Sequence, residues 1–144
     1  MAKLPANKTI NGTFGAVWVN NEKWLDIEEF SATVTIAYED VNMAESLATH
    51  KKMTGWEGEG SMTVKKVYSR GASLLADAVK EGNLPEISIV GKLDDPDAYG
   101  AERVTLNEVT FNEFTLLSFE QKTPGTEELP FNFADYDMID LITA

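Results

Sequence analysis

Apolar and polar residues alternate most regularly over residues 30–38, which read FSATVTIAY. A period of two with β-branched residues indicates a strand with one apolar face and one face of small polar side chains. Shorter runs of strand-like sequence predict four further strands, at residues 14–19, 61–68, 87–93 and 129–133.

The pair Asn20-Asn21 follows the first of these strands. Asparagine tolerates a positive φ, so the pair predicts a turn and a hairpin whose second strand begins at Trp24. A longer apolar stretch covers residues 103–120, and its alternation changes parity twice. Two hairpin strands would explain this, and so would one strand with a bulge near Asn107 and another irregularity near Asn112.

Helical spacing is convincing only between residues 74 and 79, where four apolar residues share one helix face. This spacing predicts a helix over about residues 70–81. Ser69 or Ser73 can cap its start, and Gly82 suits the position after its end. Residues 40–57 fit neither period, so we expect a long irregular excursion there, a feature that is uncommon in compact domains and usually functional or disordered.

The predicted elements follow the order strands, one helix, then more strands. Parallel sheets are built from alternating strands and helices, so this order favours an antiparallel fold. A chain of 144 residues has the length of one domain. The sequence therefore predicts a mainly β fold, a small barrel or sandwich with one flanking α-helix, in a single domain over residues 1–144.

Acidic residues outnumber basic ones by 24 to 12, which gives a net charge of −12. Tight nucleic-acid binding needs clustered cations, and an anionic membrane surface also attracts basic segments, so both are disfavoured. No apolar run approaches the roughly 20 residues of a membrane helix, and the N-terminal residues lack the apolar core of a signal peptide. We therefore expect a soluble protein that is used without export.

The chain has no cysteine, which excludes disulfides, thiolate metal sites and a cysteine nucleophile. His50 is the only histidine, so a zinc site would have too few ligands, and we expect an exposed loop residue. Asp94, Asp95 and Asp97 lack the rest of a calcium-binding loop and indicate a turn. We expect no metal, no cofactor and no catalytic site; only the abundance of carboxylates favours a hydrolase.

Residues 54–61 read TGWEGEGS, which resembles a phosphate-binding loop at first sight. A Walker loop needs a Lys-Ser/Thr pair and a following helix, whereas a strand follows here. Glu57 and Glu59 would also repel phosphate. The glycines instead predict a flexible or bulged entry into a strand, where backbones approach closely. Trp56, which lies among them, is either a packed side chain or an interface anchor.

Apolar residues remain at the extremities of the chain, where the predicted strands offer them no partner. Leu4 and Ile10 lie in an N-terminal arm, and four aliphatic residues lie between Met138 and Ile142. Extended apolar extremities on a small β domain imply burial against other subunits.

Three stretches match a known family in their order and spacing along nearly the whole chain. They are MTGWEGEGSMTV at residues 53–64 with KVYS behind it, ERVTL at 102–106 followed by VTF, and EELPFNFADYD at 127–137. In these stretches the chain resembles the core tail tube proteins of contractile phage tails, the family that includes the tube protein of a Bacillus defective prophage. R-type bacteriocins and type VI secretion use the same tube architecture.

The resemblance implies two packed antiparallel sheets with a helix on their flank, in subunits that form hexameric rings. These rings stack into a hollow tube inside a contractile sheath. The implied partners are further copies of the chain, the tail sheath protein, baseplate and tail terminator proteins, and a tape measure protein in the bore during assembly. DNA is implied only as unbound cargo, and no membrane is implied. The implied location is a virion or phage-tail-like particle assembled in the cytoplasm of a host bacterium.

The resemblance also assigns subunit contacts to the N-terminal arm 1–13, the long loop 40–57 and the C-terminal arm 134–144. The interface candidates are Leu4, Ile10, Val41, Met43, Leu47, Met53, Trp56, Tyr136, Met138, Ile139, Leu141 and Ile142. The strands at 30–38 and 58–68 are candidates for an inner wall closed across subunits, which eliminates free strand edges. The small polar residues that would face the bore are Ser31, Thr33, Thr35, Ser61 and Thr63.

A negative net charge fits a bore that lets DNA slide, because a lysine-lined wall would bind phosphate. The sequence is equally compatible with a genome-carrying phage and with a DNA-free particle. The alternative function is a non-catalytic β-sandwich that binds carbohydrate, for which tryptophans and acidic residues are the motivation.

Overall fold

The computed structural model describes residues 4–143 of the chain. Two short 3-10 helices, η1 (Ala6–Lys8) and η2 (Gly12–Phe14), precede the first strand. The remaining elements are β1 (Gly15–Val19), β2 (Glu22–Lys23), β3 (Ile27–Asn42), β4 (Thr49–Lys65), α1 (Arg70–Glu81), β5 (Ile87–Leu93), β6 (Glu102–Phe111) and β7 (Thr126–Asp140). The expected mainly β class with one flanking α-helix is confirmed.

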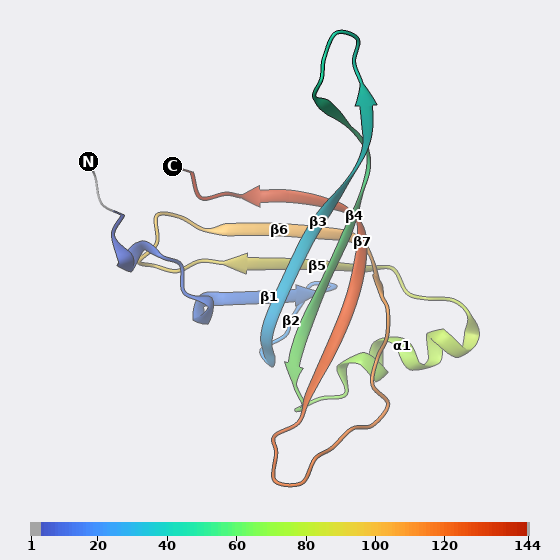
Figure 1. Ribbon diagram of the computed structural model, residues 1–144. Coiled ribbons are helices and arrows are strands. Elements are labelled where there is room, and N and C mark those ends of the chain that lie inside the picture. Colours follow the sequence, from blue (N-terminus) through green and yellow to red (C-terminus); the bar gives the residue numbers. More distant parts are fainter. Residues whose placement is uncertain (1–3, 144) are drawn as a thin grey trace.

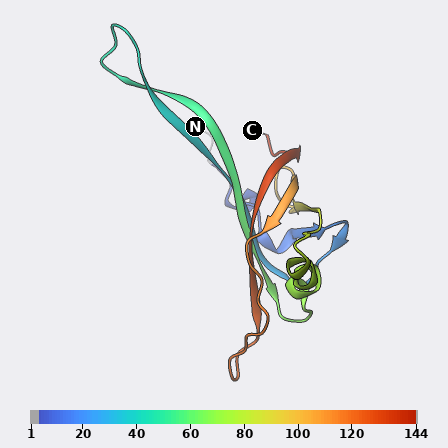
Figure 2. The same cartoon turned by 90° about the vertical axis from the view of Figure 1, so that its right-hand side faces the viewer.

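The described strands form one antiparallel sheet of seven, in the order β2-β1-β5-β6-β7-β4-β3. Strand β7 joins its two halves, because residues 126–133 pair with β4 and residues 131–140 pair with β6. The sheet bends along β7, so that β3 and β4 run across β1, β5 and β6 (Figures 1 and 2). The two separate sheets that the resemblance implied are therefore two halves of one continuous sheet.

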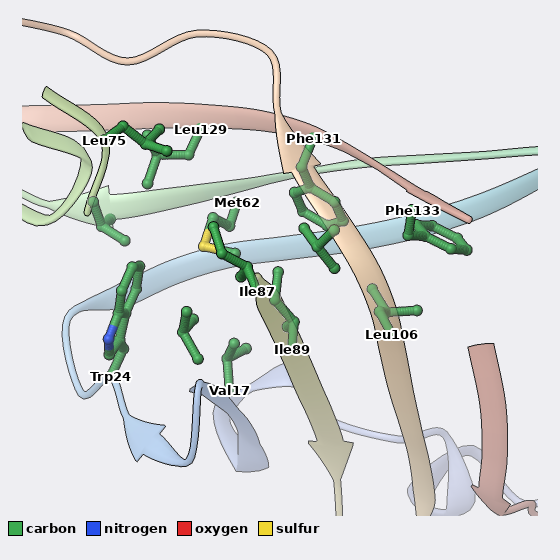
Figure 3. Packing of buried hydrophobic residues seen from close by; sticks show 13 residues of the cluster. Val17, Trp24, Met62, Leu75, Ile87, Ile89, Leu106, Leu129, Phe131 and Phe133 are labelled. Carbon is green, nitrogen blue, oxygen red and sulfur yellow. The ribbon is translucent and has the colours of Figure 1, made fainter. Parts of the chain in front are cut away.

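The core lies between the two halves of the sheet and beneath α1 (Figure 3). Met62, Ile89 and Phe131 from three different strands have no exposed surface, and Leu75 of α1 packs on the same cluster. Each large side chain buried in this way stabilises the fold by about 1.5–3 kcal/mol. The core therefore depends on contacts between residues that are far apart in the sequence.

Helix α1 covers the predicted residues 70–81, and Gly82 closes it in the left-handed conformation with φ 72°. The expected serine cap is absent, because the Ser69 side chain makes no capping hydrogen bond and Ser73 lies inside the helix. The buried carboxylate of Glu127 accepts the hydrogen bond from the Gly71 N–H instead, at 3.2 Å, and also pairs with Lys66 at 2.9 Å. A carboxylate at this end of a helix is stabilised by the helix dipole.

The side chain of Arg70 fixes α1 to the first hairpin. Its guanidinium lies 4.8 Å from the ring centroids of both Trp24 and Tyr68. It also pairs with the buried carboxylate of Asp26 and with Glu22, each at 3.2 Å. Burial lowers the pKa of Arg70, but the hydrogen bonds and charges of Asp26 and Glu22 raise that pKa by more, so the group stays charged.

The first hairpin turns at Asn20 and Asn21, whose φ angles of 49° and 68° confirm the predicted turn. Its second strand is Glu22–Lys23 and does not begin at Trp24 as predicted. The Trp24 N–H still donates to the Val17 carbonyl at 3.0 Å, while its side chain enters the core, where it is 4% exposed.

Of the two explanations for the change of parity, the structure supports the bulged strand, which is β6. The pairing with β5 shifts by one residue between Ile87 and Ile89, and Glu108 adopts φ 52° at that point. The chain leaves the sheet after Phe111, so the apolar residues that follow are not in a strand. The predicted bulge near Asn107 is thus confirmed.

The expected irregular excursion over residues 40–57 is wrong. Strands β3 and β4 stay paired as far as Asn42 and Thr49, and only residues 43–48 form the turn. The result is a long β-hairpin that projects from the body of the protein (Figures 1 and 2). Its pattern was hard to read because it has no core to bury one face, and because a register shift after Ala37 reverses the parity.

The two predicted terminal arms are anchored to the body over most of their described length. Residues 134–140 belong to β7 and pair with β6. In the N-terminal segment, the Asn11 N–H donates to Asp95 at 2.9 Å and Lys8 pairs with Asp97 at 3.5 Å. Residues 1–3 of the expected arm lie outside the described part of the chain.

The glycines of the TGWEGEGS stretch lie within β4, and two of them pack beneath aromatic rings. Gly58 and Gly60 are the register partners of Phe133 and Phe131. A Cβ atom on Gly58 would collide with the Phe133 ring, and one on Gly60 with the Phe131 ring and the Ser31 carbonyl. The expected close approach is therefore confirmed, but it involves rings as well as backbone.

We predict that Gly60→Ala lowers the free energy of unfolding by about 1–3 kcal/mol, as overpacking of a core does. Gly55→Ala is the matched control in the same strand, because a Cβ there meets nothing within 4 Å. Urea denaturation followed by tryptophan fluorescence would measure both. Equal stability of the two variants would show that the Phe131 ring and the Ser31 carbonyl can both move aside.

Candidate assembly surfaces

Exposed apolar side chains gather where the β3–β4 hairpin leaves the body. Ile36 is the register partner of Trp56, and Tyr38 is the partner of Met53, so all four lie on one face of the hairpin. Each is 39–56% exposed. Two residues of β7 extend this surface, which we call the hairpin-base patch: Ile36, Tyr38, Met53, Trp56, Tyr136 and Met138.

Trp56 connects this patch to the core. Its ring packs edge-on against Tyr136, with centroids 5.4 Å apart, and lies 6.3 Å from Phe133. The side chain is nevertheless 39% exposed. Trp56 is therefore packed on one side and leaves apolar surface exposed on the other, and its role as an interface anchor stays a prediction.

An apolar groove of about 590 Å³ lies next to the patch, between β3 and the ends of β1, β5 and β6. Val34, Leu93, Val104 and Met138 contribute to its lining. Strand β3 is the last strand of the sheet, so the described residues provide no hydrogen-bonding partner for its outer edge. A long free edge beside an apolar groove is a site where another chain can add a strand.

The opposite face of β3 and β4 is polar and points away from the core. Register pairs Ser31 with Ser61 and Thr33 with Glu59, while Thr35 faces Glu57. Thr63 is on the same face, so the five sequence-predicted wall residues lie together. Four carboxylates share this polar face, which is therefore acidic as well as small and polar: Glu29, Glu57, Glu59 and Glu128.

The other interface candidates lie in separate places. Met43 and Leu47 are exposed at the tip of the hairpin, and Val41 lies half-buried just below it. Leu4 and Ile10 are in the N-terminal segment. Three candidates lie where β7 ends, and all of them are exposed: Ile139, Leu141 and Ile142.

Sequence reasoning missed two groups of exposed apolar residues. Ile36 and Tyr38 were assigned to the apolar face of a strand, but β3 is longer than the core that it covers. Leu116, Leu117 and Phe119 were assigned to a strand that ends before them. The sequence held a signal for both groups, because the predicted strands contain more apolar residues than one small core can bury.

Metal-binding geometry is not found in residues 4–143. No group of three or more His, Cys, Asp or Glu residues there could hold a metal ion. Asp95 accepts hydrogen bonds from the backbone N–H groups of Asn11 and Asp97, as expected of a turn residue. His50 lies in β4 rather than in a loop, 3.1 Å from the Ser46 hydroxyl. Among the described helices, none has the length and apolar character needed to cross a bilayer.

A family model described as phage tail tube protein matches residues 2–140. The chain belongs to the phage tail tube family. The resemblance inferred from the three sequence stretches is thereby confirmed.

A curated relative of this tail tube protein is the phage-like element PBSX protein XkdM of Bacillus subtilis strain 168. The two are 35% identical over 137 residues, which cover 94% of this chain and 93% of the relative.

Solved structures of contractile particles share the fold. The tube-terminating cap of the anti-feeding prophage matches with a TM-score of 0.72 over 96% of this chain and 93% of that chain, at 8% identity. A chain of the PVC sheath–tube complex, from an extracellular contractile injection system in its extended state, matches with a TM-score of 0.67 over 94% and 95%, at 13% identity. At these identities the likeness shows a tail-tube fold, whereas nothing supports the carbohydrate-binding alternative.

Proposed function

We propose that this chain is the structural subunit of the inner tube of a contractile phage tail or phage-tail-like particle. Its copies form hexameric rings, and the rings stack around a hollow bore. The observation that carries this proposal is the match to the tail tube family over residues 2–140. The free β3 edge and the hairpin-base patch support it independently, because identical copies could cover both.

Ring formation would bury the surfaces that the free subunit leaves open. Trp56 and Tyr136 supply rigid aromatic surface, which is enriched at the centres of interfaces. Strand addition at the β3 edge would satisfy its backbone hydrogen-bonding groups, as closed barrels do. The described N-terminal segment and the end of β7 add further apolar contacts at the periphery.

The polar face of β3 and β4 lines the bore in this proposal. The carboxylates of Glu57 and Glu59 would repel DNA phosphates, and serine and threonine offer no cation to hold them. DNA, where a particle carries it, would then pass without binding. The role of the chain is structural rather than catalytic, and it requires no cofactor.

The proposed tube function also implies a set of partners. We propose further copies of this chain, a sheath protein, a baseplate and a tube terminator, since the similar structures include a sheath–tube complex and a terminating cap. A tape measure protein would occupy the bore during assembly. The particle would be assembled in the cytoplasm of a bacterial host, without a membrane.

Electron microscopy of the purified chain, alone and with its baseplate proteins, tests the function directly. We expect rings with sixfold symmetry and stacked tubes. A chain that stays monomeric under both conditions would contradict the proposal.

Replacing Trp56 by alanine tests the hairpin-base patch. We expect subunit association to weaken by about 2 kcal/mol or more, roughly 30-fold, as at an interface hot spot. The control is Trp24→Ala, which removes a core side chain and should instead lower the unfolding free energy by about 3–5 kcal/mol. Analytical ultracentrifugation and urea denaturation separate the two effects, and unchanged association of the Trp56 variant would remove the patch from the interface.

Thiol labelling tests the bore, because the chain has no cysteine of its own. In assembled tubes, Thr33→Cys should react with a small maleimide that diffuses into the bore and not with a maleimide carried on a large polymer. Val79→Cys on the exposed side of α1 is the control and should react with both reagents. Reaction of the Thr33→Cys tubes with the polymer reagent would place the polar face outside the tube.

A further inference from the structure

All the sulfur of this chain is in methionine, because the chain has five methionines and no cysteine. Oxidants that attack sulfur can therefore react here only with thioethers, whose oxidation to the sulfoxide turns an apolar side chain into a polar one. Four of the five methionines lie in the described part of the chain: Met43, Met53, Met62 and Met138. The place of each side chain in the fold decides which of them an oxidant can reach.

Burial separates these four methionines into two groups. Met62 has no exposed surface, and its side chain lies inside the core cluster, with its sulfur in yellow (Figure 3). Met43, Met53 and Met138 are instead 54%, 49% and 48% exposed. A dissolved oxidant can therefore reach three of the side chains in the folded subunit, whereas Met62 becomes accessible only on unfolding. The buried methionine thus provides an internal control for the state of the fold.

Two of the exposed methionines belong to the hairpin-base patch, and they reach it from different strands. Met53 of β4 is the register partner of Tyr38, and Met138 of β7 is the partner of Val104. Met138 also contributes to the lining of the apolar groove beside the patch. Met43 lies apart from them at the hairpin tip. A pair of exposed thioethers therefore lies within the surface that is buried against another copy in the proposed tube.

Oxidation of these two side chains would change the surface that the subunit offers for burial. Unoxidised methionine is flexible and apolar, so it fills irregular gaps in an interface. Each sulfoxide adds a strongly polar oxygen, and a polar group that is buried without a hydrogen-bond partner opposes association. The oxygen of an oxidised Met138 would lie at a groove whose lining is mainly apolar. An oxidised subunit should therefore keep its fold, because Met62 is not reached, and lose affinity for its neighbours.

We infer that Met53 and Met138 make subunit association sensitive to peroxide: their oxidation in the free subunit blocks assembly, whereas assembly itself shields them. Each side chain consumes one hydrogen peroxide. The thioether sulfur attacks one peroxide oxygen, an S–O bond forms while the O–O bond breaks, and the second oxygen leaves as water once it has taken the proton of the first. The sulfur is thereby oxidised by two electrons to the sulfoxide. The inference rests on the proposed tube function and adds a form of regulation to the same surface.

Hydrogen peroxide treatment of the free, full-length subunit tests this inference. Mass spectrometry of peptides should find one added oxygen on Met53 and on Met138 and none on Met62. Analytical ultracentrifugation should then show association weakened by about 10-fold or more, as expected when an unpaired polar group is buried. Tubes assembled before the treatment should stay intact, with both patch methionines unoxidised. Oxidation of Met53 and Met138 without loss of association, or oxidation of both inside intact tubes, would overturn the inference.

Leucine substitutions separate the patch from the other exposed methionine. Each variant is compared with its own untreated sample, so that the readout is the response to peroxide. A double variant with Met53→Leu and Met138→Leu should lose this response. Met43→Leu, which changes a similarly exposed methionine outside the patch, should keep it. A response that persists in the double variant, or that disappears in Met43→Leu, would refute the assignment to the patch.

Enzymatic reduction provides a second readout on the unmodified sequence. Methionine sulfoxide reductases for both sulfoxide epimers, with dithiothreitol as the reductant, release the added oxygen as water while two thiols become a disulfide. Association should recover as the added oxygen is lost. Loss of the oxygen without recovery of association would mean that peroxide had acted elsewhere in the chain, against the inference. Failure of the untreated chain to form rings or tubes would instead contradict the proposed function, and the inference with it.

Discussion

Strand β7 hydrogen-bonds with β4 along its first half and with β6 along its second half, and this shared ladder determines the shape of the subunit. The bend that it requires brings Phe131 and Phe133 across the glycines of β4 and closes the core. Glu127, near the start of the same strand, binds the first turn of α1 through the Gly71 N–H. One strand thus fixes both halves of the sheet and the only long helix described.

The core made by β7 is small, and the sheet extends beyond it. Strands β3 and β4 continue as a hairpin that nothing in the described chain covers, and β3 ends the sheet with a free edge. In a monomer these features would favour aggregation. In a tube the uncovered hairpin and the free β3 edge can each be buried against a different copy of the chain. The proposed function therefore depends on a subunit whose core is fully packed, while its hairpin and its β3 edge remain free to contact other subunits.

Much of the local structure could be predicted because its causes are local. The helix at 70–81 follows from apolar spacing and from the glycine that ends it, and the turn at Asn20-Asn21 follows from the tolerance of asparagine for positive φ. The polar face of Ser31, Thr33 and Thr35 follows from strand alternation, whereas its pairing with Ser61 is a matter of register that only the structure shows. The part of the hairpin between residues 40 and 57 could not be predicted in this way, because most of it is exposed on both faces in the subunit.

The sequence by itself determined the mainly β class, the position of the helix, the acidic character and, through three matching stretches, the family. Only the tertiary structure decided that one strand serves both halves of the sheet and that Glu127 rather than Ser69 caps the helix. It also decided which apolar residues stay exposed, from Trp56 at the hairpin base to Leu117 at the opposite end. The physical reason is that periodicity reports the face on which a side chain lies, whereas burial depends on what the rest of the chain places opposite that face.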